Sequence, residues 1–108
     1  MAKRSKKDEI DPQRSIREQF YPKGRNRGLL IRVQVDFFKT GEVARYALTL
    51  VDLNGGPDNG RILGYDNVHD YHHRHCLGKV EPVEFNTYEE IEARFEKETQ
   101  RYLKEGEI

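Results

Sequence analysis

The sequence has almost none of the features that cross-link a protein or hold it in a membrane. It contains one cysteine, which excludes an internal disulfide and makes a reducing compartment the natural expectation. No apolar run approaches the roughly 20 residues that a membrane-spanning helix needs. Residues 1–10 are charged and lack the apolar segment of a secretory signal. We therefore expect a cytoplasmic protein that has no contact with a membrane.

Apolar side chains are also scarce. Of the 108 residues, 35% are hydrophobic and 35% are charged. A chain of this length usually forms one domain and buries roughly two-thirds of the surface that its unfolded form exposes. We therefore expect a single folded domain with a small core.

The net charge is zero, but the two signs are unevenly distributed. Residues 1–28 hold nine Lys/Arg and four Asp/Glu, whereas residues 81–108 hold four Lys/Arg and nine Asp/Glu. We place a basic N-terminal arm at residues 1–27. Such an arm is able to attract nucleic acid through its phosphates, although a solvated tail that aids solubility is the commoner meaning.

The rest of the chain, residues 28–108, is predicted to form an α+β domain. Apolar residues alternate with polar ones in residues 29–38 and 43–53, which predicts an antiparallel hairpin. Residues 61–67 and 71–76 resemble a third and a fourth strand. In the arm, Asp11 followed by Pro12 is typical of a helix start and predicts a short helix over residues 12–20.

The C-terminal segment has the clearest pattern. Thr87 and Glu90 form a capping box, and Gly106 stands where a helix C-cap is expected. Between them, apolar residues recur at helical spacing, which predicts an amphipathic helix with its apolar stripe on the sheet. The predicted architecture is a small antiparallel sheet of about four strands, covered by this helix.

All four histidines fall within residues 69–75. Side chains of a strand alternate between its faces, so His73 and His75 would share one face and Arg74 would point to the other. Two exposed imidazoles suit the cleavage of RNA without a metal. One removes the proton of a ribose 2′-hydroxyl, and the other protonates the leaving 5′-oxygen. An arginine then stabilises the charge on the phosphate.

The same segment also offers ligands for a divalent ion such as zinc or manganese. His73 and His75, together with His69, Asp66 or Cys76, supply enough donor atoms. The sequence contains no pair of CxxC motifs and no HExxH motif, so this hypothesis has less support than proton transfer. Structural roles are the simpler alternative for a turn residue such as His69 and for a lone cysteine.

A longer series of residues surrounds the histidines. It comprises Arg61, Tyr65, Asp66, Asn67, His69, His72, His73, Arg74, His75, Gly78, Val80, Glu81 and Pro82. The order of this series resembles the TumE family, whose members are classed as toxins of prokaryotic toxin–antitoxin systems, and the similarity extends from about residue 28 to residue 102. The resemblance implies a cytoplasmic toxin that is neutralised by an antitoxin encoded beside it, typically with a helix-turn-helix. RNA cleavage is a further step, by analogy with other small sheet-based toxins.

The leading hypothesis is therefore a toxin that is a metal-independent ribonuclease. His73 and His75 are the candidate base and acid, with His69 next, and the phosphate is bound by Arg74 or by Arg61. A metal-dependent nuclease and a non-enzymatic module that binds RNA or protein are the alternatives. An exposed sheet edge also makes a homodimer plausible. The remaining candidate substrate-binding residues are Tyr65, Asp66, Asn67 and His72.

Overall fold

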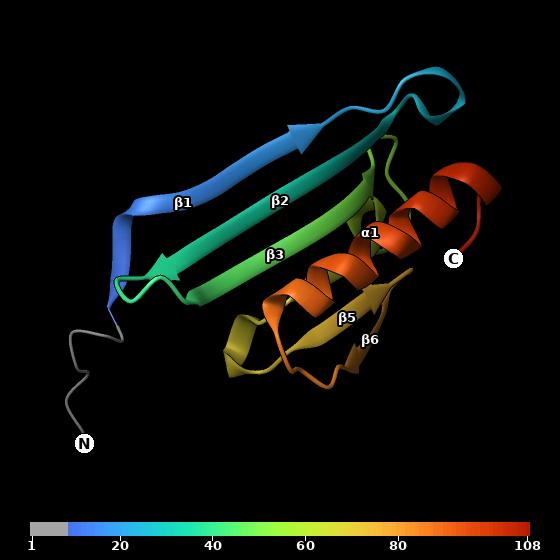
Figure 1. Ribbon diagram of the computed structural model, residues 1–108. Helices are drawn as coiled ribbons and strands as arrows, with labels where there is room; N and C mark the ends of the chain where they lie inside the picture. Colours follow the sequence, from blue (N-terminus) through green and yellow to red (C-terminus); the bar gives the residue numbers. More distant parts are fainter. Residues whose placement is uncertain (1–8) are drawn as a thin grey trace.

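The computed structural model describes residues 9–108, which form an antiparallel sheet of six strands and one α-helix (Figure 1). The strands lie in the order in which they occur along the chain, so each one pairs with its sequence neighbours. No helix in this part of the chain is long and apolar enough to cross a membrane. The strands are β1 (Ile10–Phe20), β2 (Leu29–Phe38), β3 (Val43–Asp52), β4 (Arg61–Asp66), β5 (His73–Cys76) and β6 (Lys79–Pro82), and the helix is α1 (Tyr88–Glu105).

The predicted α+β class and the central hairpin are confirmed. Strands β2 and β3 pair along their length, and Gly41 in the connection has a φ of 96°, a left-handed value that glycine adopts without strain. Strands β4 and β5 correspond to the predicted third and fourth strands. The structure adds β1 and β6, so the sheet has more strands than the sequence predicts.

The prediction of a short helix over residues 12–20 is wrong. Residues 15–20 pair with residues 31–36 of β2, and the register shifts before Ser15, where Pro12 cannot donate to a ladder. Asp11 does cap a backbone N–H, but it is that of Gln13, 3.0 Å away. Pairing with β2 therefore outweighs the local helix signal. The first part of the predicted arm, residues 1–8, lies outside the described residues.

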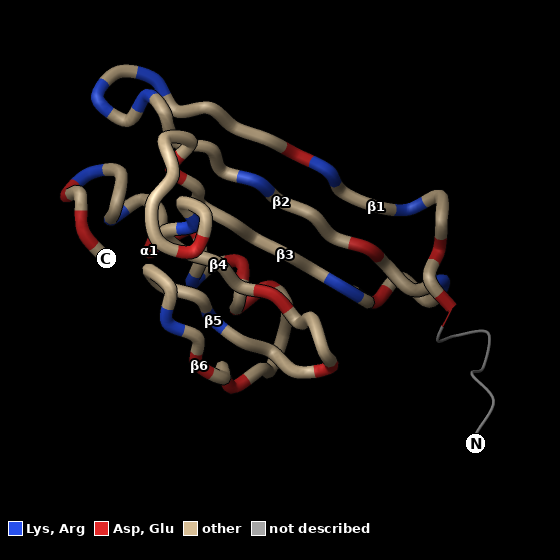
Figure 2. The backbone as a smooth tube through the Cα atoms, turned by 180° about the vertical axis from the view of Figure 1, so that it is seen from behind, with Lys and Arg blue, Asp and Glu red and all other residues tan. Residues whose placement is uncertain are grey.

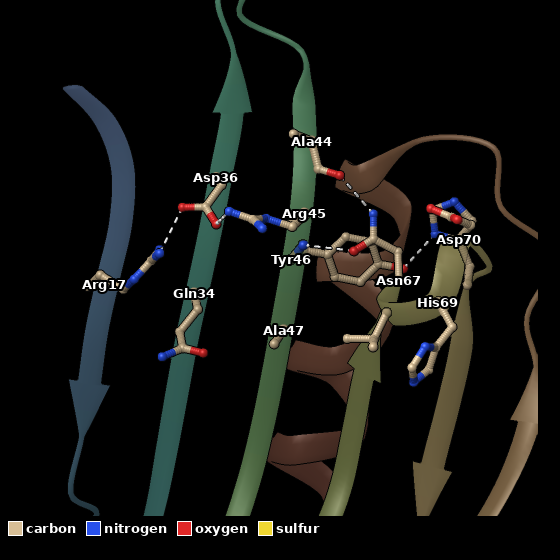
Figure 3. A pocket seen from close by; sticks show the side chains of 12 residues that line it. Arg17, Gln34, Asp36, Ala44, Arg45, Tyr46, Ala47, Asn67, His69 and Asp70 are labelled. Atoms are coloured by element: carbon tan, nitrogen blue, oxygen red, sulfur yellow. Dashed lines mark hydrogen bonds and ion pairs between the residues drawn. The ribbon is translucent and has the colours of Figure 1, made fainter. Parts of the chain in front are cut away.

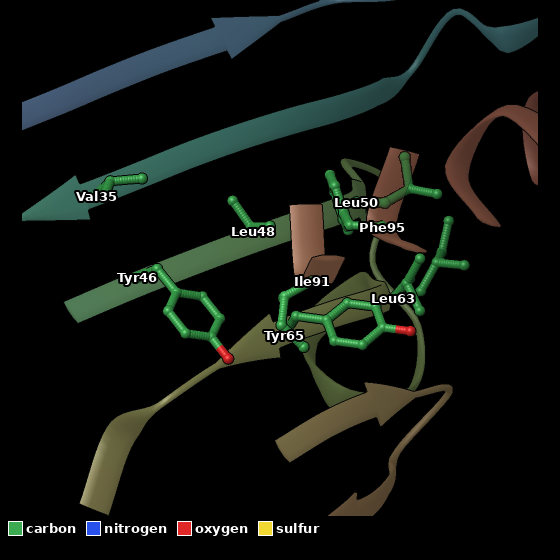
Figure 4. Close-up of a cluster of buried hydrophobic side chains, with 9 residues drawn as sticks. Val35, Tyr46, Leu48, Leu50, Leu63, Tyr65, Ile91 and Phe95 are labelled. Atoms are coloured by element: carbon green, nitrogen blue, oxygen red, sulfur yellow. The ribbon is translucent and has the colours of Figure 1, made fainter. Parts of the chain in front are cut away.

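Helix α1 covers one face of the sheet, mainly over β3 and β4, and its predicted caps are confirmed. Thr87 Oγ1 accepts from the backbone N–H of Glu90 at 3.2 Å, and Gly106 closes the helix with a φ of 77°. The helix places apolar side chains on those of the sheet (Figure 4). The most deeply buried members of this core are Val35, Leu48, Leu50, Leu63, Tyr65 and Ile91.

The opposite face of the sheet carries many polar residues, and no α-helix of residues 9–108 lies on it. Figure 2 views the backbone from behind, with charged residues along β1, β2 and β3. Two rows of directly paired residues cross this face. One row runs through Arg17, Gln34, Ala47, Asp66 and His73. The next row runs through Gln19, Arg32, Thr49, Gly64 and His75. Paired residues project to the same side, so arginines of β1 and β2 share this face with the two histidines of β5.

Candidate functional site

The β4–β5 hairpin brings together three of the predicted site residues. Its register pairs Asp66 with His73 and Gly64 with His75. The predicted sharing of one face by His73 and His75 is thereby confirmed. Asp66, the last residue of β4, lies on this face as well, directly beside both imidazoles. We refer to these three residues as the Asp66–His73–His75 cluster.

One carboxylate contacts both imidazoles of the cluster. Nε2 of His73 lies 2.7 Å from Oδ1 of Asp66, and Nε2 of His75 lies 3.0 Å from Oδ2. The two rings are nearly perpendicular, with their centres 4.7 Å apart. Oδ1 of Asp66 also accepts from the backbone N–H of Val68 at 3.0 Å, which fixes the orientation of the carboxylate. The three donor groups therefore converge on one point.

The expectation that the two imidazoles are exposed is wrong. Asp66, His73 and His75 are 7%, 5% and 9% exposed. The turn η4 (Val68–Asp70) follows directly after β4, and the ring of Tyr71 lies 4.5 Å from that of His73. The pattern of the sequence places a residue on a face of a strand, but it does not show which loop covers that face.

Arg61 lies beside the cluster because Gly64 leaves space for it. A Cβ atom at Gly64 would come within 3.1 Å of Cδ of Arg61 and 3.7 Å of Cβ of His75. Nε of Arg61 is held by Oδ2 of Asp58 at 2.7 Å. Burial lowers the pKa of His75 below its ordinary value, and the charge of Arg61 lowers it further, against the opposite effect of Asp66.

Arg74 points to the helix side of the sheet, as the strand pattern predicts. It binds the carboxylate of Glu98 on α1 with two nitrogens and contacts the hydroxyl of Tyr65 at 3.2 Å. Hydrogen bonding to Glu98 raises the pKa of Arg74. Tyr65 is fully buried, and its pKa is raised to about 12 by burial and by its bond to Glu98. The structure thus separates Arg74 and Tyr65 from the cluster and joins them to the helix.

His72 and Asn67 also make structural contacts. The ring of His72 stacks on Phe85 with centres 3.7 Å apart, and its Nδ1 is 2.8 Å from the hydroxyl of Tyr46. The side chain of Asn67 accepts from the N–H of Tyr46 and donates to the carbonyl of Ala44, both at 3.0 Å. These bonds fix the turn after β4 to the start of β3, and the cluster is positioned by that turn.

His69 lies outside the cluster, in a neighbouring pocket on the same sheet face (Figure 3). The pocket has a volume of about 600 Å³ and lies between β1–β3 and the η4 turn. Asp36 lines the pocket and pairs with Arg17 at 2.7 Å and with Arg45 at 3.1 Å. His69 has a left-handed φ of 64°, a strained conformation for a non-glycine residue. Its position predicts contact with a bound molecule rather than proton transfer within the cluster.

The comparisons with known proteins leave the family open. No protein-family model matches the chain, and no curated protein or solved structure resembles it significantly. The resemblance to TumE toxins therefore depends on the motif residues alone.

Two features of the site go beyond what the sequence shows. The sequence offers Asp66 as a turn former, a substrate ligand or a metal ligand, but it does not show that this one carboxylate contacts both imidazoles. Gly64 falls within the predicted third strand, residues 61–67, but the sequence does not show that it makes room for Arg61. The sequence does contain a signal for the role of Asp66, because a hairpin of β4 and β5 pairs Asp66 with His73. The second depends on the path of the Arg61 side chain, which no sequence pattern predicts.

Proposed function

We propose that the protein is a toxin of a toxin–antitoxin system and that it cleaves RNA at the Asp66–His73–His75 cluster. The observation that carries the proposal is the convergence of two imidazoles and one carboxylate on a polar sheet face, with Arg61 beside them. The toxin assignment is supported by the motif of the β4–β5 hairpin. RNA cleavage is supported by the chemistry of the cluster.

The surface around the cluster suits a phosphate backbone. Arg17 of β1 and Arg32 of β2 lie in the two paired rows, and the cluster stands at the far end of these rows. Between them lie Gln34, the small side chains of Ala47 and Thr49, and the glycine at position 64. Guanidinium groups bind phosphate oxygens in pairs, and the small residues let a chain of nucleotides approach the sheet. We propose that RNA lies across these rows and reaches the cluster beside Arg61.

The geometry favours the metal-dependent form of this reaction over the metal-independent form that the sequence favours. Nε2 of each imidazole faces the Asp66 carboxylate, so transfer of a proton to or from RNA would require an imidazole to leave it. Two imidazoles and a carboxylate can instead hold an ion that activates water at neutral pH. In either form, Arg61 stabilises the negative charge that develops on the phosphate.

The test is cleavage of single-stranded RNA by the purified protein. We expect fragments when Zn²⁺ or Mn²⁺ is supplied, and intact RNA in excess EDTA. Cleavage that persists in EDTA and leaves 2′,3′-cyclic phosphate ends would support the metal-independent form. Intact RNA under every one of these conditions, without growth arrest when the protein is produced in bacteria, would overturn the proposal.

Arg61 offers a matched pair of variants. We expect Arg61→Ala to reduce cleavage by about 10²-fold or more, the usual effect of removing one group that stabilises transition-state charge. Arg101→Ala is the control, because Arg101 pairs with Glu105 on the exposed side of α1.

A neutralising partner is expected as well. Co-purification with the product of the neighbouring reading frame tests for the antitoxin, and size-exclusion chromatography tests for the homodimer.

A further inference from the structure

We infer that Asp66, His73 and His75 form the binding site of a single divalent transition-metal ion. Nε2 of each imidazole and the carboxylate oxygens of Asp66 are the ligand atoms. This inference concerns binding alone and does not depend on the proposed function. Its grounds are the hydrogen-bonding capacity of the cluster, the chemistry of its donor atoms and the contacts that orient them.

The contacts of His73 point its Nε2 at the carboxylate of Asp66. Its Nδ1 lies 3.1 Å from the carbonyl oxygen of Tyr71, which can only accept a hydrogen bond, so Nδ1 carries the proton. Nε2 faces Oδ1 of Asp66 at 2.7 Å. Both atoms carry lone pairs that a cation between them can accept.

His75 points its Nε2 at the same carboxylate. Its Nε2 faces Oδ2 of Asp66 at 3.0 Å, and its Nδ1 is buried without a hydrogen-bond partner among residues 9–108. One shared ion would be coordinated by both Nε2 atoms and by the carboxylate. Protons on the imidazoles are the alternative to this ion.

The donor set indicates which ions fit. Imidazole suits Zn²⁺ and its transition-metal neighbours, whereas Ca²⁺ and Mg²⁺ prefer sites built from oxygen. The three ligand atoms lie within 4.8 Å of one another. Two ligands that each lie about 2.0–2.1 Å from a zinc ion are at most about 4.2 Å apart, so small rotations of the side chains admit the ion. Three protein ligands leave a coordination position for water.

The surrounding contacts are those that metal ligands usually have. A metal-binding histidine typically donates its other ring N–H to a carbonyl or carboxylate. The contact of His73 with the Tyr71 carbonyl provides this support, and the N–H of Val68 fixes the carboxylate of Asp66. Asp58 pairs with Arg61 and so offsets the positive charge nearest to the site. The cluster thus has both its ligands and the groups that orient them.

The experiment is titration of the metal-stripped, full-length protein with Zn²⁺ or Co²⁺ alone. We expect one equivalent to bind, visible absorption bands typical of Co²⁺ bound by nitrogen and oxygen, and a higher melting temperature with Zn²⁺. His73→Ala and His75→Ala should weaken Zn²⁺ binding at least 100-fold. His69→Asn is the matched control and should bind Zn²⁺ as the wild type does, because His69 lies outside the cluster and asparagine tolerates its left-handed φ.

The result that overturns the inference is measured on the wild type, so it does not depend on the folding of a variant. A wild-type protein that binds none of Zn²⁺, Co²⁺, Ni²⁺ and Mn²⁺ at micromolar concentration would overturn the inference. Equal Zn²⁺ binding by a folded His73→Ala/His75→Ala double variant would also overturn it. Metal binding without RNA cleavage would refute only the proposed function. RNA cleavage by the metal-free protein would refute only the metal-dependent form of the reaction and would leave the metal site standing.

Discussion

Asp66 determines the geometry of the cluster at the scale of single residues. It is the shared partner of His73 and His75, and it also accepts from the backbone of Val68. A buried carboxylate with three partners is sensitive to substitution, because its loss leaves several polar groups without a partner at once.

The first prediction concerns Asp66→Asn, which keeps the size of the side chain but removes its charge. We expect the free energy of unfolding to fall by about 1–3 kcal/mol and Zn²⁺ binding to be lost. Urea denaturation and metal titration measure these two effects. Asp70→Asn is the control, because Asp70 lies on the same turn with a φ of 65° that asparagine accepts. Equal losses in both variants would show that the turn, not the carboxylate, is responsible.

The second prediction concerns Gly64→Ala. The added methyl group would approach Cδ of Arg61 to 3.1 Å, and the flexible arginine would move away from the cluster. We expect RNA cleavage to decrease while Zn²⁺ binding is retained, as measured by a cleavage assay and a metal titration. The effect should disappear when Arg61 is already alanine, because the two positions act through one side chain. Additive effects of the two substitutions would contradict this explanation.

At the scale of elements, a strand or helix with a clear pattern in its own sequence is predictable. A strand that forms because it pairs with a neighbouring strand is not. Alternation predicted β2 and β3, and the capping residues predicted α1 with its ends. Strand β1 was missed because Asp11 and Pro12 resemble a helix start, whereas the strand depends on pairing with β2. The shared face of His73 and His75 followed from the period of a strand. Their burial did not, because it depends on the chain that follows β4.

Helix α1 is joined to the sheet by an ion pair that makes stability depend on pH. Burial alone would raise the pKa of Glu98, but its bonds with Arg74 and Tyr65 outweigh burial and hold that pKa below its usual range. A carboxyl group with a lowered folded pKa stabilises the fold above its unfolded pKa of about 4.3. This contribution is lost as the pH falls through the lower, folded pKa.

The third prediction is that Glu98→Gln flattens the acid side of the stability profile. The wild type should lose more stability than the variant between about pH 5 and pH 3, around the unfolded pKa near 4.3. Urea midpoints measured across this range provide the test. Glu105→Gln is the control, since its ion pair with Arg101 is largely exposed and exposed pairs contribute little. Parallel profiles for the wild type and Glu98→Gln would refute the role of the ion pair.

At the scale of the whole molecule, the two faces of the sheet differ in chemistry, because α1 covers only one of them. The face beneath α1 holds the apolar core (Figure 4), whereas the opposite face holds the cluster and the pocket that Figure 3 shows. A ligand that binds the polar face therefore leaves the core undisturbed. Substitutions on that face should change binding more than folding.

The fourth prediction tests this polar face through Arg32, which is paired with Thr49 in the same row as His75. We expect Arg32→Gln to weaken RNA binding for all sequences alike and to reduce the slope of log affinity against log salt by about 1, the effect of losing one phosphate contact. Fluorescence anisotropy at several salt concentrations measures both quantities. Arg101→Ala on the helix is the control, and an equal change there would exclude a specific role for the polar face.

The order of the strands has a consequence for how the cluster is assembled. Strands β4 and β5 are consecutive, so residues 66–75 supply every side chain of the cluster. A loop this short closes at a small entropic cost, and contacts between sequence neighbours form quickly during folding. The ligands of the inferred ion can therefore come together in a single hairpin, before the ends of the chain have found their places. An ion bound at this stage would guide folding by fixing the register of β4 and β5.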